Sequence, residues 1–225
     1  MRILALDAAL ARCAAGIVID EELAAQRIEP GGRGQAALLA PMVQDVLGEA
    51  RIAADQLDLI AATIGPGSFT GIRAALALAH GLGLAGQIPV IGVTVGEALA
   101  RALPRLGGRA LWVAIAARRG RIFLDRGAVE GGAGGIDSRA EDDLPAPPGP
   151  LALAGDAAGG VAARLAARDI DVMLTDARAP LPRHIALIAA ERHAGTRAKL
   201  APVPLYVDPP EAHPPAAGLR PPPVP

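Results

Sequence analysis

The sequence predicts an α/β fold with a mixed sheet, and three observations lead to that prediction. The first 30 residues hold short apolar segments separated by tight turns, which indicates an antiparallel strand meander. From there to about residue 105, segments with helical spacing alternate with apolar strands, a pattern typical of parallel strand pairing. Hydrophobic residues make up 52% of the 225 residues but aromatic ones only 2%, so the core must be built from Ala, Leu, Ile and Val.

Local signals define the elements of the first half. Leu38, Leu39 and Met42 begin a run with helical spacing, and Pro41 within it is expected to kink that helix or to mark its start. Thr94 and Glu97 have the spacing of a capping box, which predicts the start of another helix. The expected elements, in order, are strands 2–6, 13–19 and 23–28, a helix over 38–47, a strand 57–64, a helix 70–85, a strand 88–93 and a helix 95–102.

After residue 105 the periodic signal weakens, and we expect a smaller second unit there. A Gly-, Pro- and acid-rich stretch over 127–150 is expected to be a loop or linker. The other expected elements are a hairpin of strands 110–115 and 121–124, a helix 156–167, a strand 170–174 and a helix 182–193 that starts with proline. The predicted organisation is an N-terminal lobe 1–105, a reduced C-terminal lobe 106–200 and a proline-rich, disordered tail 201–225.

Charge and cysteine usage exclude several classes of protein. With 22 basic and 23 acidic residues the net charge is −1, which gives no general attraction to nucleic acid or an anionic membrane. One cysteine cannot form an internal disulfide, and the four histidines lack metal-ligand spacing. Residues 74–96 carry no charged side chain, but glycines and Pro89 interrupt them, so a membrane span is not expected. We expect a cytoplasmic protein without a bound metal or a secretory signal.

The most informative segment is Gly65-Pro66-Gly67-Ser68-Phe69-Thr70-Gly71-Ile72-Arg73, placed between a predicted strand and a predicted helix. A glycine-rich turn before a helix can bind phosphate through backbone N–H groups. The spacing matches neither a P-loop nor a dinucleotide motif, and a tight turn with Ser68 or Thr70 as N-cap is the alternative that the pattern favours.

Candidate binding residues are therefore few. Gly65, Gly67 and Ser68 are weak candidates for nucleotide binding, as is Asp7 at the end of the first strand. The residues after Asp7 lack the glycine and hydroxyl groups of a phosphate loop, so no catalytic residue is assigned.

Small residues recur every fourth position in the helix that follows this turn. Such a row lets a second helix approach closely, or lets the helix pack tightly on its own sheet, and the sequence alone does not separate the two. We take docking of another chain as the sharper hypothesis. The surface expected for it consists of Gly71, Ala75, Ala79 and Gly83, with Leu39, Met42, Val43 and Val46 of the preceding helix.

Four segments together resemble the bacterial TsaB (YeaZ) family. They are residues 3–7, 39–47, 65–73 and 89–94, within a match over about residues 1–125, and residues 204–206 are similar to the family's closing motif. The resemblance implies an ASKHA (actin/ribonuclease-H-like) fold of two lobes. It also implies a role in forming N6-threonylcarbamoyladenosine in tRNAs that read codons beginning with A. In that family the paralogue TsaD holds the metal and performs the transfer to tRNA. TsaB docks on TsaD and does not catalyse this transfer, and TsaE is the associated ATPase.

Several positions depart from the family pattern. Ala8, Gln35 and Asp208 stand where the family usually has a hydroxyl residue, a histidine and an arginine, and Ala116 or Ala117 replaces an acidic residue. These losses weaken the case that the chain binds a nucleotide by itself. No firm cofactor is therefore expected, and ATP or ADP is assigned at most to the partner interface.

The leading hypothesis is a non-catalytic subunit that pairs with TsaD, works with TsaE, contacts tRNA through the complex and self-associates through the same surface. The alternative is a small ASKHA-type ATPase or metabolite kinase, which needs intact phosphate loops and two full lobes. A metalloprotease is disfavoured because the chain has no His-x-x-x-His pair.

Overall fold

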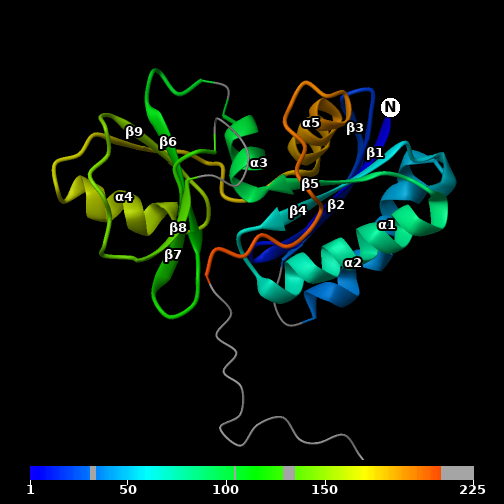
Figure 1. Cartoon of the computed structure of the whole chain (residues 1–225), viewed down its shortest axis with the longest axis horizontal. Coiled ribbons are helices and arrows are strands. Elements are labelled where there is room, and N and C mark those ends of the chain that lie inside the picture. The colour runs from blue at the N-terminus through cyan, green and yellow to red at the C-terminus, as the bar shows by residue number, and fades with distance from the viewer. Residues whose placement is uncertain (31–33, 104, 129–134, 209–225) are drawn as a thin grey trace, which may run out of the picture.

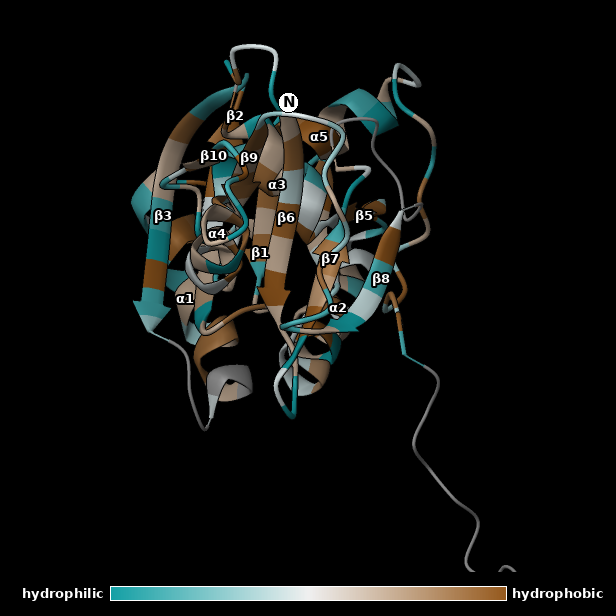
Figure 2. Ribbon diagram, turned by 90° about the vertical axis from the view of Figure 1, so that its left-hand side faces the viewer, coloured by the Kyte–Doolittle hydropathy of each residue, from teal (hydrophilic) through white to brown (hydrophobic). Residues whose placement is uncertain are grey.

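A computed structural model describes residues 1–30, 34–103, 105–128 and 135–208 of the chain. Its strands form two five-stranded sheets in two lobes, and helices α3 (Val95–Arg101) and α5 (Pro182–His193) lie between them (Figure 1). Hydrophobic residues follow the central strands of each sheet, while the edge strands β3 and β8 carry more hydrophilic residues (Figure 2). Within the described residues, no helix combines the length and the hydropathy needed to cross a membrane.

The first sheet has the order β3-β2-β1-β4-β5. Its strands are β1 (Arg2–Asp7), β2 (Arg12–Ile19), β3 (Glu22–Pro30), β4 (Leu59–Gly65) and β5 (Val90–Thr94). The first three pair antiparallel, whereas β1, β4 and β5 run parallel. Because side chains alternate along a strand, Leu4 and Leu6 pack with helices α1 (Gln35–Ala50) and α2 (Phe69–Gly86), while Ile3 and Ala5 pack with α5 on the other face.

The second sheet repeats this topology on a smaller scale. Its order is β10-β9-β6-β7-β8, with antiparallel pairs around β7 and parallel pairs around β9. The elements are β6 (Ala110–Ala116), β7 (Arg121–Asp125), β8 (Ile136–Ala140), β9 (Leu151–Ala154), α4 (Ala158–Ala166) and β10 (Val172–Leu174). A loop residue, Leu144, packs with Trp112 and α4 on the side of the sheet that corresponds to α1 and α2 in the first lobe.

Most expected elements are confirmed, with a short 3-10 turn added at Ala54–Gln56. Helix α1 begins at Gln35, so Pro41 lies inside it and does not mark its start. The expected loop 127–150 contains strand β8, whose sequence Ile-Asp-Ser-Arg-Ala has no apolar alternation and whose pairing with β7 makes it a strand. Helix α5, expected within the C-terminal lobe 106–200, packs on the first sheet.

Part of the expected disordered tail is an ordered segment. Residues 200–208, which we call the strap, make hydrogen bonds to β4 and α2. The expectation of disorder is therefore corrected for residues 201–208, and residues 209–225 lie outside the described part of the chain.

A buried ion pair joins α3 to α5. Glu97 completes the predicted capping box, since its N–H donates to Thr94 Oγ1 at 3.1 Å and its Oε2 accepts from the Thr94 N–H at 3.0 Å. Its Oε1 accepts from Arg192 Nη2 at 2.6 Å, and the two side chains are 0% and 2% exposed. Arg197 Nη1 reaches the same oxygen at 3.2 Å. One carboxylate thus caps the start of α3 and fixes this helix to α5.

Removing the arginine of this pair is expected to be costly. Arg192→Met keeps the bulk of the side chain but removes the buried cation that pairs with the Glu97 carboxylate. The free energy of unfolding should therefore fall by about 3–5 kcal/mol. Arg183→Met is the matched control, because the Arg183–Glu22 pair is exposed and worth less than about 1 kcal/mol. Urea unfolding of both variants measures the difference, and equal losses would contradict the role given to Arg192.

Candidate functional site

The glycine-rich turn lies between β4 and α2, as the sequence predicts. Ser68 is the N-cap of α2, because its Oγ accepts a hydrogen bond from the Gly71 N–H at 3.2 Å. Gly65 and Gly67 have φ angles of +117° and +151°, which side-chain-bearing residues rarely adopt. The capping prediction is thus confirmed for Ser68 rather than Thr70.

The loop after Asp7 sits directly on this turn. Ser68 N–H donates to the Ala9 carbonyl at 2.7 Å. A Cβ added at Gly67 would lie 2.1 Å from the Ala9 oxygen, and one added at Gly71 would lie 1.9 Å from the Ala8 oxygen. Carbonyl oxygens of the chain itself therefore stand against the start of α2, where a phosphate would have to approach. The glycines are explained by close backbone packing.

Asp7 is held inside the protein. Its side chain has no solvent exposure, and its Oδ1 accepts from Thr63 Oγ1 at 2.6 Å and from the Ala9 N–H at 3.1 Å. Burial raises the pKa of Asp7 to about 6, although these two hydrogen bonds oppose the rise. The charge of the neighbouring Arg12 also opposes the rise, while its guanidinium donates to the carbonyls of Ala179 and Pro180.

The structure brings together Asp7, Gly65, Gly67 and Ser68, the four weak candidates for nucleotide binding. Each of these residues has a structural role within the chain, as a helix cap, in a turn or in a packing contact. Their geometry therefore gives no support for nucleotide binding. Among the positions that depart from the family pattern, Ala8 packs on Gly71, while the side chain of Gln35 is outside the described set.

The row of small residues faces the protein's own sheet. Ala75 and Ala79 are 0% exposed, and a Cβ added at Gly83 would lie 2.6 Å from Val90 Cγ2 on β5. On α1, all four expected interface residues are 4% exposed or less, namely Leu39, Met42, Val43 and Val46. The expectation that these eight residues form an open docking surface is corrected, because they pack α1 and α2 onto the first sheet.

The opposite side of α2 is exposed and largely apolar, with His80 as an exposed polar residue on it. Ala77, Gly81 and Leu84 are exposed there, and Leu84 has 85% of its surface open to solvent. From Ala74 to Gly86 the helix carries no Asp, Glu, Lys or Arg. We call Ala77, Gly81 and Leu84 the outer α2 face. Sequence periodicity does not predict this face. Helix α2 is apolar on nearly all sides, so no polar side marks the direction of the solvent.

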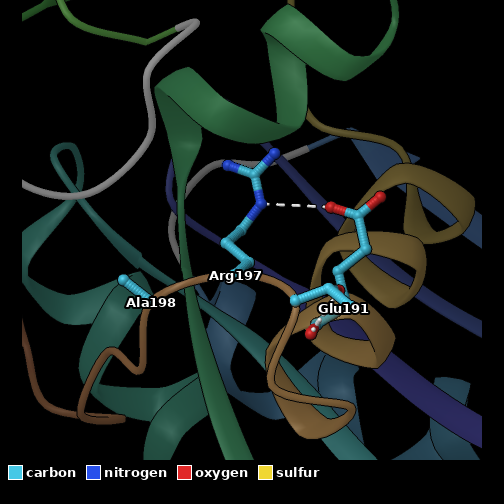
Figure 3. Close-up of a pocket in the computed structure, with 4 residues that line it drawn as sticks. Glu191, Arg197 and Ala198 are labelled. Carbon is cyan, nitrogen blue, oxygen red and sulfur yellow. Dashed lines mark hydrogen bonds and ion pairs between the residues drawn. The ribbon is translucent and has the colours of Figure 1, made fainter.

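A polar hollow of about 520 Å³ lies beside α5, lined by Glu191, Thr196, Arg197 and Ala198 (Figure 3). Arg197 Nε donates to Glu191 Oε2 at 3.1 Å, and Thr196 Oγ1 donates to the Glu191 carbonyl at 2.9 Å. The charges of the hollow are therefore used in local pairing. In the described part of the chain, no group of three or more His, Cys, Asp and Glu side chains could hold a metal ion.

Close packing at Gly71 predicts a sharp contrast between two glycines of one helix. Gly71→Ala should destabilise the protein by several kcal/mol, because the methyl group would overlap the Ala8 carbonyl. Gly81→Ala, with nothing within 4 Å of the new Cβ, should stabilise it by about 0.5–1 kcal/mol through helix propensity. Thermal and urea unfolding measure both, and a tolerated Gly71→Ala would disprove the close approach.

The raised pKa of Asp7 predicts a pH-dependent stability. Because the folded protein holds this proton up to about pH 6 whereas an unfolded aspartate releases it near its usual 3.8, the stabilisation is complete below about pH 4 and is lost as pH rises through 6. The difference amounts to about 3 kcal/mol. Urea unfolding between pH 4 and 7 should show this loss for the native chain and not for Asp7→Asn; parallel curves would refute it.

Sequence comparisons identify relatives of this chain. A family model described as "TsaD: tRNA N6-adenosine threonylcarbamoyltransferase" matches residues 26–179. The TsaB protein of Escherichia coli K12 is 35% identical over 124 residues, which is 55% of this chain and 53% of that protein. The chain thus spans little more than half the length of the curated relatives it matches.

Solved structures extend the likeness to nearly the whole chain. A Pseudomonas aeruginosa protein described as similar to peptidase YeaZ has a TM-score of 0.74 at 26% identity, covering 92% of this chain and 99% of that one. An ADPNP-bound dehydratase activator from Clostridium difficile, at 9% identity and a TM-score of 0.51 over 89% of this chain and all of that one, shares the fold alone. The chain belongs to the TsaD family as its model defines it, and it is similar to TsaB and YeaZ proteins in sequence and fold.

Proposed function

We propose that this chain is a non-catalytic subunit of the machinery that forms N6-threonylcarbamoyladenosine in tRNA, and that it docks on a TsaD-type paralogue through the outer α2 face. Its relatives in Escherichia coli and Buchnera aphidicola are named tRNA threonylcarbamoyladenosine biosynthesis proteins, which supports the pathway. The observation that carries the docking is Leu84, which is 85% exposed on an uncharged stretch of helix.

The family match supports a TsaD-type protein as the partner. The family named for the transferase matches a region of this chain that includes α1 and α2. A transferase of this family should therefore carry helices at the corresponding place. Two similar folds can pair through similar faces in a quasi-two-fold arrangement, as homodimers do. Ala77 and Gly81 would allow the two backbones to approach closely.

The same reasoning covers the other members of the complex. Self-association through the outer α2 face competes with docking on the paralogue, because both would bury Leu84. A net charge of −1 supports the view that a partner supplies most of the phosphate contact with tRNA. The family resemblance is the support for the two remaining parts of the proposal, which are TsaE as the associated ATPase and ATP or ADP at the interface with the paralogue.

The alternative of a small ATPase or metabolite kinase would use Asp7 and the glycine-rich turn. The buried Asp7 carboxyl and the packed Ala8 and Ala9 carbonyls disfavour it. Calorimetry of the chain with Mg-ATP separates the two functions, since tight binding with turnover would support the kinase and overturn the proposal.

A charge on the outer α2 face should block docking. Leu84→Glu is expected to weaken binding to the purified TsaD paralogue at least tenfold, because a carboxylate would be buried without a partner. Leu174→Glu is the control, since Leu174 is 46% exposed on β10 in the other lobe. Calorimetric titration gives both affinities; equal affinities would exclude the outer α2 face.

In cells, depletion of the protein should lower the threonylcarbamoyladenosine content of tRNA, measured by mass spectrometry of digested nucleosides. Leu174→Glu should restore the modification and Leu84→Glu should not. An unchanged nucleoside profile after depletion would contradict the proposed function itself.

A further inference from the structure

The strap, residues 200–208, lies beside the start of α2 and reaches the second lobe. Leu205 N–H donates to the Ile64 carbonyl at 2.8 Å, next to the glycine-rich turn. His80 Nε2 lies 2.8 Å from the Pro202 carbonyl, and Asp208 Oδ2 accepts from Ser138 Oγ of β8 at 3.1 Å. The strap is therefore fixed at both ends and along its length.

Near its C-terminal end, Tyr206 of the strap stacks with side chains at the start of α2. The Arg73 guanidinium carbon lies 3.6 Å from the centre of the Phe69 ring and 5.6 Å from that of Tyr206. Arg73 Nε and Nη2 both donate to the Tyr206 hydroxyl, at 2.9 and 2.6 Å. The two ring centres are 6.1 Å apart. Tyr206 thus holds Arg73 in place over Phe69, and we call these three residues the aromatic stack.

The aromatic stack is exposed to solvent, although aromatic residues are rare in this chain. Phe69 and Tyr206 are 51% and 54% exposed, and Val203 on the strap is 56% exposed. These two rings are half of the four aromatic side chains in the sequence. Aromatic and arginine side chains that are covered on association contribute a large share of binding energy at protein interfaces.

The aromatic stack continues the outer α2 face. Phe69 and Arg73 precede Ala77 by eight and four residues, so all three project from one side of the helix, in line with Gly81 and Leu84. This continuity points to one occupant for both regions.

We infer that the strap is part of the surface that binds the TsaD-type paralogue, with Tyr206 positioning Phe69 and Arg73 for that contact. The inference rests on the proposed function. The partner is expected to place an apolar side chain against the two rings. It is also expected to place a carboxylate or carbonyl oxygen opposite Arg73, because Nε and Nη2 already donate to Tyr206 and Nη1 remains to donate to the partner.

Calorimetric titration of the full chain with the purified paralogue tests this inference. Tyr206→Ala should weaken binding about tenfold or more, while Tyr206→Phe, which keeps the ring but releases Arg73, should weaken it by a smaller factor. Phe69→Ala should resemble Tyr206→Ala. Leu174→Ala is the control and should bind as the native chain does. Because the substituted side chains are half-exposed, the urea midpoint of each variant should stay close to that of the native chain.

The outcomes separate this inference from the proposed function. If Leu84→Glu abolishes binding while Tyr206→Ala and Phe69→Ala bind normally, the strap is not part of the surface and the proposed function stands. If the native chain does not bind the paralogue, both fail. Should Tyr206→Ala instead reduce binding of the chain to isolated tRNA and leave the paralogue affinity unchanged, the aromatic stack contacts RNA and the inference is overturned.

Discussion

Helix α2 can approach the first sheet closely only because Gly71, Ala75, Ala79 and Gly83 present no bulk on the side that meets it. That approach seats the carbonyls of Ala8 and Ala9 against the start of the helix and closes the glycine-rich turn to a phosphate. Asp7, two residues before Ala9, is fully buried, and this burial raises its pKa. With its small side turned inward, α2 leaves Leu84 facing solvent, and the proposed docking depends on that direction.

The two lobes repeat one sheet topology, and they are joined by contacts between helices as well as by the chain. Glu97 caps α3 and pairs with Arg192 of α5, so one carboxylate serves both the local start of a helix and the junction of the lobes. The strap adds a second connection, since it runs from α2 to Ser138 on β8. A partner bound across the outer α2 face and the aromatic stack would therefore meet a surface held in one arrangement.

Local signals in the sequence predict the local structure of this chain. Thr94 and Glu97 revealed their capping box, and the glycine-rich turn was placed correctly between a strand and a helix. The four-residue spacing identifies the row of small residues but not what the row faces, because spacing defines the sides of a helix and not its neighbours. Strand β8 and the strap are not predicted, because their structure depends on partners and not on their own pattern. Ser138 pairs with β7, the preceding strand, and Tyr206 contacts Arg73, 133 positions earlier in the sequence.

The central claim is that α2 is the contact between this chain and a TsaD-type paralogue. Hydrogen–deuterium exchange of the chain, with and without the purified paralogue, tests it directly by locating the backbone amides that become protected. The account predicts slower exchange in peptides that cover residues 69–86 and 200–208, with little change in residues 110–125. Protection confined to the second lobe, with residues 69–86 unchanged, would contradict it.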